Sequence, residues 1–185
     1  MRHNWLLIAT AMLLTCAATS KFDLSNYFSD PPIAAPLVNE ATLLGAYGAG
    51  CTKSESSPSG GPYLERHAYF DASTGRWIEA SVQVDGPESR ELVGVLVTSV
   101  SLCTEKSELR APFAPTGARG VHLGDPIQKA LARLGSPLRT ETGQLGQEST
   151  IQVLEYFPEK SNPAFCFRLH VLRERVVAIS FVFTE

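Results

Sequence analysis

Residues that could build a catalytic centre are few and scattered in this chain. Beyond the first twenty residues the histidines are His67, His122 and His170, and the patterns around them place them on a strand, in a loop and on another strand. A general base must lie within hydrogen-bond reach of the group that it serves, and this spacing brings no two histidines together. We therefore expect no catalytic histidine.

Other motifs of small enzymes are also missing from the sequence. Ser59 precedes two glycines but is not the centre of the Gly-x-Ser-x-Gly turn that exposes a nucleophilic serine. The glycine-rich segments lack the Lys-Ser or Lys-Thr ending of a phosphate-binding loop. Glu79 and Glu155 could approach each other across a sheet, but nothing fixes their separation, and carboxylates on strands are usually solvated. The sequence thus predicts neither an enzyme nor a cofactor.

The three cysteines beyond the first twenty residues favour a disulfide. Cys51 follows the first expected helix and Cys103 ends the first group of strands, so we predict a Cys51–Cys103 bridge. Cys166 alternates with apolar residues in an expected strand, which predicts an unpaired, packed thiol. Without paired short spacings or neighbouring histidines the three cysteines make a poor zinc site, and no metal is expected.

A protein-binding face is easier to argue than a catalytic centre. Residues 76–84 alternate, with apolar side chains on one side of the expected strand and polar ones on the other. If helices cover the apolar side, the opposite face presents Trp77, Glu79, Ser81, Gln83, Arg168 and His170. An exposed Trp beside an Arg on a rigid sheet is typical of a binding hot spot. In the alternative, residues 21–37 cover Trp77. The polar loop 54–62 is a second candidate contact.

The elements that would position these residues begin after an export signal. Arg2 is followed by an apolar run over residues 5–14, which suits a secretory signal and is too short to span a bilayer. Small residues at 18–20 predict cleavage before Lys21. Alternatively, residues 13–16 resemble a bacterial lipobox and Cys16 becomes a lipidated N-terminus, or Cys16 is discarded with the signal.

The rest of the chain divides into a leader and two halves. Residues 21–37 contain three prolines and are expected to be extended. Residues 38–103 form a first helix–meander repeat, with a helix over 39–49, a loop over 54–62 and strands over 63–70, 76–84 and 92–102. Residues 104–118 are a linker. Residues 119–185 form a second repeat, with a loop over 141–149 and strands over 150–157, 164–172 and 176–183.

The helix of the second half is the best defined element of the sequence. Asp125 is expected to be its N-cap, with Pro126 at the first helical position. Gly135 and Pro137 end it. The apolar residues Ile127, Ala130, Leu131 and Leu134 share one face.

These patterns predict an α+β fold of tandem helix–loop–antiparallel β-meander repeats, with the helices packed on one face of a sheet. The alternative is that two helix–meander segments look alike without being copies.

The second half resembles a known family. The residues that carry the likeness are the helix start Gly120-Val121-His122-Leu123-Gly124-Asp125, the helix end Leu134-Gly135-Ser136-Pro137, a strand containing Tyr156, and the closing residues Val176 to Ser180. They resemble the repeat unit of the SmpA/OmlA (BamE-like) outer-membrane lipoproteins and of the β-lactamase-inhibitor-protein-like fold, over about residues 119–184. The first half fits only by pattern. The resemblance implies helices on an antiparallel sheet and a non-enzymatic, envelope-located, protein-binding role, and it transfers no catalytic residue.

The net charge and the export signal limit the classes of partner that we expect. Removing Arg2 from the 16 Lys and Arg leaves 15, against 19 Asp and Glu, which is a net charge of −4. No basic patch indicates nucleic acid, and a membrane contact is expected only through a lipid at Cys16. We expect a periplasmic protein, possibly anchored to the outer membrane, that binds a periplasmic or envelope protein as an inhibitor or immunity protein. A structural outer-membrane lipoprotein of envelope assembly is the second reading, and a small periplasmic enzyme the third.

Overall fold

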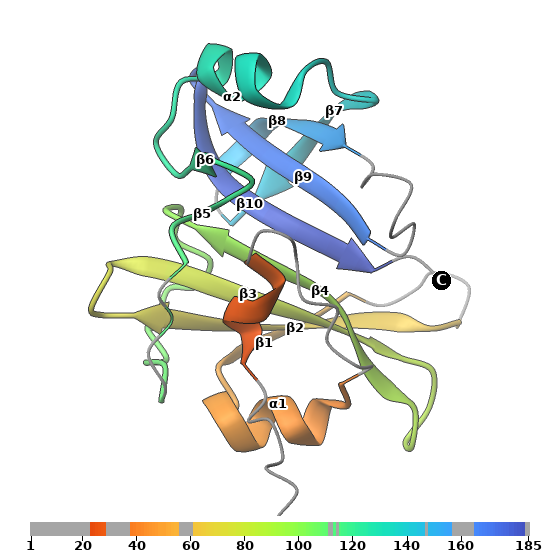
Figure 1. Ribbon diagram of the computed structural model, residues 1–185. Helices are drawn as coiled ribbons and strands as arrows, with labels where there is room; N and C mark the ends of the chain where they lie inside the picture. The colour runs from red at the N-terminus through yellow and green to blue at the C-terminus, as the bar shows by residue number, and fades with distance from the viewer. Residues whose placement is uncertain are drawn as a thin grey trace, which may run out of the picture.

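One antiparallel sheet of eight strands organises the molecule (Figure 1). The computed structural model describes residues 23–28, 38–55, 61–110, 113, 115–146, 148–156 and 165–183. The first half of the chain contributes η1 (Leu24–Phe28), α1 (Glu40–Tyr47), β1 (Cys51–Glu55), β2 (Tyr63–Asp71), β3 (Arg76–Val84) and β4 (Arg90–Thr98). The second contributes β5 (Gly117–Ala118), β6 (Val121–His122), α2 (Ile127–Leu134), β7 (Arg139–Leu145), β8 (Glu148–Tyr156), β9 (Phe165–Leu172) and β10 (Arg175–Phe183).

The strands follow the order β1-β2-β3-β4-β10-β9-β8-β7, so the last strand of each half lies at the centre. In Figure 1, β1–β4 form the lower part and β7–β10 the upper part, with α1 below and α2 above. The central pair β4–β10 is antiparallel and matches Val97 with Ile179 and Val95 with Phe181. All four side chains are buried, so the two halves share one core.

Both halves use the same contact to hold their helix. Tyr69 of β2 donates a hydrogen bond from its hydroxyl to the carbonyl of Gly48, the C-cap of α1, over 3.0 Å. Tyr156 of β8 donates in the same way to Gly135, the C-cap of α2, over 3.4 Å. Both glycines have positive φ, 87° and 80°, where a side chain would be strained. Each half therefore runs from a short helix into a four-stranded meander.

The predicted α+β fold with helices packed on one face is wrong, because the chain is mostly antiparallel sheet. Among the described residues, α1 buries three side chains and α2 buries only Ala130. Two eight-residue helices are too short to cover eight strands. The core on the first face, which carries Ile78 and Val82, also takes in side chains of η1 and the side chains of Phe113, Ala118 and Val121.

The sequence predicts neither of two strands: it assigns no element to residues 51–53, and it predicts loops over residues 54–55 and 141–145. β1 occupies residues 51–55, and β7 begins at Arg139 and takes up half of the segment read as a loop. Both lie at the sheet edges and are largely polar. An edge strand that is solvated on both faces has no apolar alternation to identify it. Each meander consequently has four strands and not the three that were expected.

The N-cap of α1 is the residue predicted from the sequence, and the N-cap of α2 lies one residue later than predicted. Asn39 caps α1, where its side chain accepts from the backbone N–H of Thr42 over 2.9 Å. Pro126, not Asp125, is the N-cap of α2. Asp125 instead accepts from the His122 backbone over 2.9 Å and from Lys129 over 2.8 Å, so it closes the turn before the helix.

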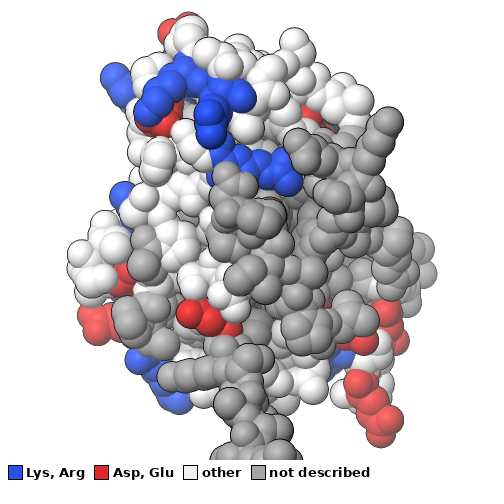
Figure 2. Space-filling model, viewed as in Figure 1, with Lys and Arg blue, Asp and Glu red and all other residues white. Residues whose placement is uncertain are grey.

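Charged side chains are unevenly distributed over the molecule. Figure 2, viewed from the side on which η1 lies, shows its main group of Lys and Arg side chains in the upper part, where α2 carries Lys129 and Arg133. Among the described residues, no helix has both the length and the apolar character to cross a membrane.

Candidate functional site

The second face of the sheet, opposite η1 and the helices, carries a strip of polar side chains. Cross-strand partners point to the same face of a sheet. The register pairs Glu79 with Leu96, Leu96 with Ser180, Ser180 with Arg168 and Arg168 with Glu155. Arg66 of β2 reaches the same row, with its Nη1 lying 3.2 Å from Glu79. We call the set Arg66, Glu79, Ser81, Glu155, Arg168, His170 and Ser180 the polar strip.

Three ion pairs hold the two arginines of the polar strip. Arg66 donates to Glu79 over 3.2 Å and to Glu55 over 3.1 Å. Arg168 donates through Nε to Glu155 over 2.7 Å. The arginine side chains are 34% and 36% exposed, whereas those of Glu79 and Glu155 are 9% and 10% exposed. The structure therefore presents partly exposed guanidinium groups on buried carboxylates, which fixes their direction before any partner arrives.

Burial shifts the pKa values of Glu79 and Arg168, and their ion-pair partners oppose its effect. Burial raises the pKa of the Glu79 carboxyl, although Arg66 opposes the shift. Burial works against the charge of Arg168, yet the hydrogen bond that Arg168 donates to Glu155 keeps the pKa of Arg168 above its usual value.

His170 is the titratable base of the polar strip. Its Nε2 lies 2.9 Å from the Ser180 hydroxyl, and its Nδ1 is buried without a hydrogen-bond partner among the residues that the structure describes. Burial, together with the positive charges of Arg168 and Arg66, lowers the pKa of His170 to about 4. The ring is therefore neutral at pH 7.

We expect His170 to make the protein sensitive to mild acid. The unfolded chain binds a proton at this ring below about pH 6.5, and the folded protein does so only near pH 4, so stability is lost as pH falls through that window. In His170→Asn, the difference between urea midpoints at pH 7 and pH 5 should be smaller than in the wild type. An equal difference in the two proteins would show that His170 does not titrate as described.

Four of the six predicted contact residues, Glu79, Ser81, Arg168 and His170, belong to the polar strip, and Gln83 lies on the same strand face. Gln83 donates to the Asp85 carboxylate over 3.2 Å. The exposed position expected for Trp77 is wrong, since this side chain is only 3% exposed. Its ring packs 5.4 Å from that of Phe70, in a second apolar cluster that includes Leu102 and Cys103. Trp77 is therefore buried in this cluster and does not lie on a free surface.

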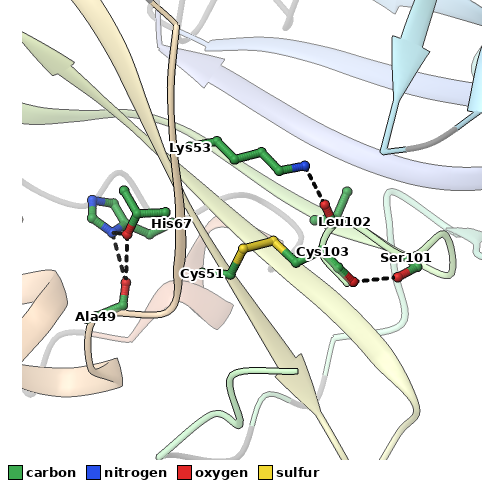
Figure 3. The surroundings of a disulfide bond; sticks show 8 residues. Ala49, Cys51, Lys53, His67, Ser101, Leu102 and Cys103 are labelled. Carbon is green, nitrogen blue, oxygen red and sulfur yellow. Dashed lines mark hydrogen bonds between the residues drawn. A yellow bond between two sulfur atoms is a disulfide. The ribbon is translucent and has the colours of Figure 1, made fainter. Parts of the chain in front are cut away.

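The cysteine predictions are confirmed. Cys51 and Cys103 form a disulfide, which ties β1 to the turn after β4 (Figure 3). Lys53 reinforces the same junction by donating to the Leu102 carbonyl over 2.6 Å. Cys166 is free and buried. Burial raises the pKa of its thiol to about 11, so the thiolate needed for reaction is scarce at neutral pH.

Sequence reasoning missed the partners that organise the polar strip. Arg66, Glu155 and Ser180 lie 13, 13 and 10 residues from the side chains that they contact, so only the strand register reveals the pairs. Reading β2 and β8 as alternating strands could have placed Arg66 and Glu155 on this face. Cys16 and most of the loop 54–62 lie outside the described residues.

A second cluster of ionisable groups lies on the first face of the sheet, between α1 and strands β2 and β4. Glu40, Glu65, His67 and Arg90 come from α1, β2 and β4, and sequence separations of up to 50 residues hid them from sequence analysis. Their geometry is taken up below.

No protein-family model, curated protein or solved structure matches this chain. The resemblance to the SmpA/OmlA and β-lactamase-inhibitor-protein-like folds therefore stays a prediction.

Proposed function

We propose that this protein is an exported, non-enzymatic binding protein of the bacterial envelope, of the inhibitor or immunity type. The observation that carries the proposal is the polar strip, in which two arginines of fixed direction stand on one face of a continuous sheet formed by both halves of the chain. Partly exposed arginines backed by buried groups are the side chains that dominate many protein interfaces.

The extent of the polar strip favours a macromolecular partner. It runs from β2 to β8 across six adjacent strands. With strands about 4.8 Å apart, it is about 24 Å wide. A standard protein interface buries about 800 Å² on each partner, which corresponds to a patch of about that width in each direction. A small substrate would instead need polar groups that converge on one point.

The disulfide is compatible with an oxidising compartment. Combined with the signal-like first twenty residues, it supports our assignment to the periplasm. A lipid at Cys16 would add an anchor without altering the face that binds.

The test is a matched pair of charge substitutions on opposite faces. Ser81→Glu places a new charge and extra volume between Arg66 and the centre of the sheet, and Gln128→Glu changes an exposed residue of α2. A partner is first captured from periplasmic extract with the wild-type protein, and its affinity is then measured for each variant. We expect Ser81→Glu to weaken binding at least tenfold, about 1.4 kcal/mol, and Gln128→Glu to leave it unchanged.

Equal affinities for the two variants, with both folded by circular dichroism, would refute binding through the polar strip. Turnover of a small substrate by the purified protein would refute the non-enzymatic assignment.

A further inference from the structure

The ionisable cluster between α1 and the sheet contains three side chains of the types that bind metal ions. Glu40 is the first residue of α1, and Glu65 and His67 lie on the same face of β2. One atom from each, two carboxylate oxygens and a ring nitrogen, lie within 4.8 Å of one another. Imidazole nitrogen and carboxylate oxygen are ligands that Zn²⁺ accepts. His67 is 2% exposed and Glu40 is 8% exposed, so the group is shielded from water.

The orientation of His67 is the observation that points to a cation. Its Nδ1 lies 3.0 Å from the carbonyl oxygen of Ala49, which requires the ring proton at Nδ1 (Figure 3). Its Nε2 then faces Glu40 Oε1 at 2.8 Å and Glu65 Oε1 at 3.8 Å. Two carboxylates around Nε2 call for a positive charge at this point, which a proton on Nε2 supplies when the ring is an imidazolium and which a metal ion bound to Nε2 would supply in its place. Metal-binding histidines commonly donate their other ring N–H to a backbone carbonyl in this way.

Arg90 supplies a positive charge to the same carboxylates. Its guanidinium binds Glu40 through Nε and also through Nη2 at 2.9 Å, and it reaches Glu65 Oε2 at 2.6 Å. Among the four groups, Arg90 is the most exposed, with 28% of its side chain accessible. It also lines an open hollow of about 450 Å³ together with Tyr63 and Asp85. That hollow offers the guanidinium space, and Asp85 offers it a carboxylate other than those of Glu40 and Glu65.

We propose that Glu40, Glu65 and His67 form a site for a transition-metal dication of the Zn²⁺ class, and that Arg90 is the cation with which the metal competes. One imidazole and two carboxylates provide three ligands and leave a fourth position for water. When the metal binds, Arg90 turns into the hollow. The site lies on the first face of the sheet and is independent of the function proposed for the polar strip.

Arg90→Met provides the sharpest test, because it removes the competing charge and keeps the ligands. Untagged protein, purified from the periplasm and stripped with chelator, is titrated with ZnCl₂ by calorimetry, with MgCl₂ as the comparison metal. We expect one Zn²⁺ per chain, no Mg²⁺ binding, and at least tenfold tighter Zn²⁺ binding in Arg90→Met than in the wild type. His67→Gln in the Arg90→Met background should lose at least tenfold in affinity.

His122→Gln is the matched control, since His122 also faces a carboxylate, that of Asp125 at 3.8 Å, but on an exposed turn. It should leave Zn²⁺ binding unchanged. Co²⁺ absorption of the wild-type protein gives a second readout that does not depend on a variant folding. No Zn²⁺ binding by folded Arg90→Met, binding that survives His67→Gln, or a wild-type protein without a Co²⁺ spectrum would each overturn the proposal.

Discussion

The double variant Cys51→Ser/Cys103→Ser should be about 4 kcal/mol less stable than the wild type. The bridge closes a loop over a sequence separation of 52 residues, and the loss of chain entropy in the unfolded state on closing such a loop is worth about 4 kcal/mol at 25 °C in the chain-entropy model. The disulfide also fixes the turn after β4, which belongs to the apolar cluster that contains Trp77. Urea unfolding followed by circular dichroism measures the difference.

Trp77 provides a local readout of the same change. The two tryptophans of the chain are Trp5 and Trp77, so a protein made without residues 1–20 reports Trp77 alone. In the double variant its fluorescence should shift to longer wavelength, because the turn that shields it is released. Cys166→Ser is the control, and it should leave the fluorescence unchanged because Cys166 is unpaired. A stability loss below 1 kcal/mol would show that the bridge does not constrain this region.

Arg168→Met should destabilise the protein by about 3 kcal/mol. Glu155 is buried, and Arg168 holds its carboxylate at 2.7 Å. Removing one member of a buried ion pair leaves the other charge without compensation, which typically costs about 3–5 kcal/mol. The lower end applies because Arg168 is itself 36% exposed, so solvent already screens part of the pair. Denaturant midpoints at pH 7 test the value.

The double variant Glu155→Leu/Arg168→Met separates stability from binding. Replacing both charges by apolar side chains of similar volume removes the unpaired carboxylate, so most of the lost stability should return. Partner affinity should stay low, because the guanidinium is gone. Recovery of both stability and affinity would mean that Arg168 stabilises the sheet and does not contribute to partner binding.

The buried strands could be predicted from the sequence, and the edges of the sheet could not. Residues 76–84 alternate cleanly, and the structure places Ile78 and Val82 on the first face and Glu79 on the second. Such alternation records burial on one side. β1 and β7 each have only one neighbouring strand, so their polar sequences match those of loops.

The prediction that the helices cover one face of the sheet fails because the sequence signals of a helix are local. Asn39 and Gly135 mark helix ends reliably through caps within four residues. They do not tell how much of a sheet the helix covers: the apolar face of α2 packs on the core, but only Ala130 of this helix is fully buried. The same limit applies to Trp77, whose apolar ring was assigned to the polar side of β3. Its ring lies instead in an apolar cluster that includes Leu102 and Cys103, which are 25 and 26 positions later in the sequence.

The candidate sites depend still more on distant pairing. His67 and Glu40 are 27 residues apart, and Arg90 is 50 residues from Glu40. Neither spacing is a motif, because the sheet and α1, not the local chain, bring them together. The polar strip could be predicted in part, since strand alternation places Glu79, Ser81, Arg168 and His170 on one face once the strands are known.

Photo-crosslinking from single positions tests binding through the polar strip most directly. A photoreactive amino acid replaces Gln83, beside the polar strip on β3, or Gln128, on the exposed side of α2, and the cells are irradiated before the envelope fraction is separated. We expect the position-83 protein to yield one discrete crosslinked species that contains a second polypeptide, and the position-128 protein to yield none. Crosslinking from position 128 alone would contradict the assignment of the binding face.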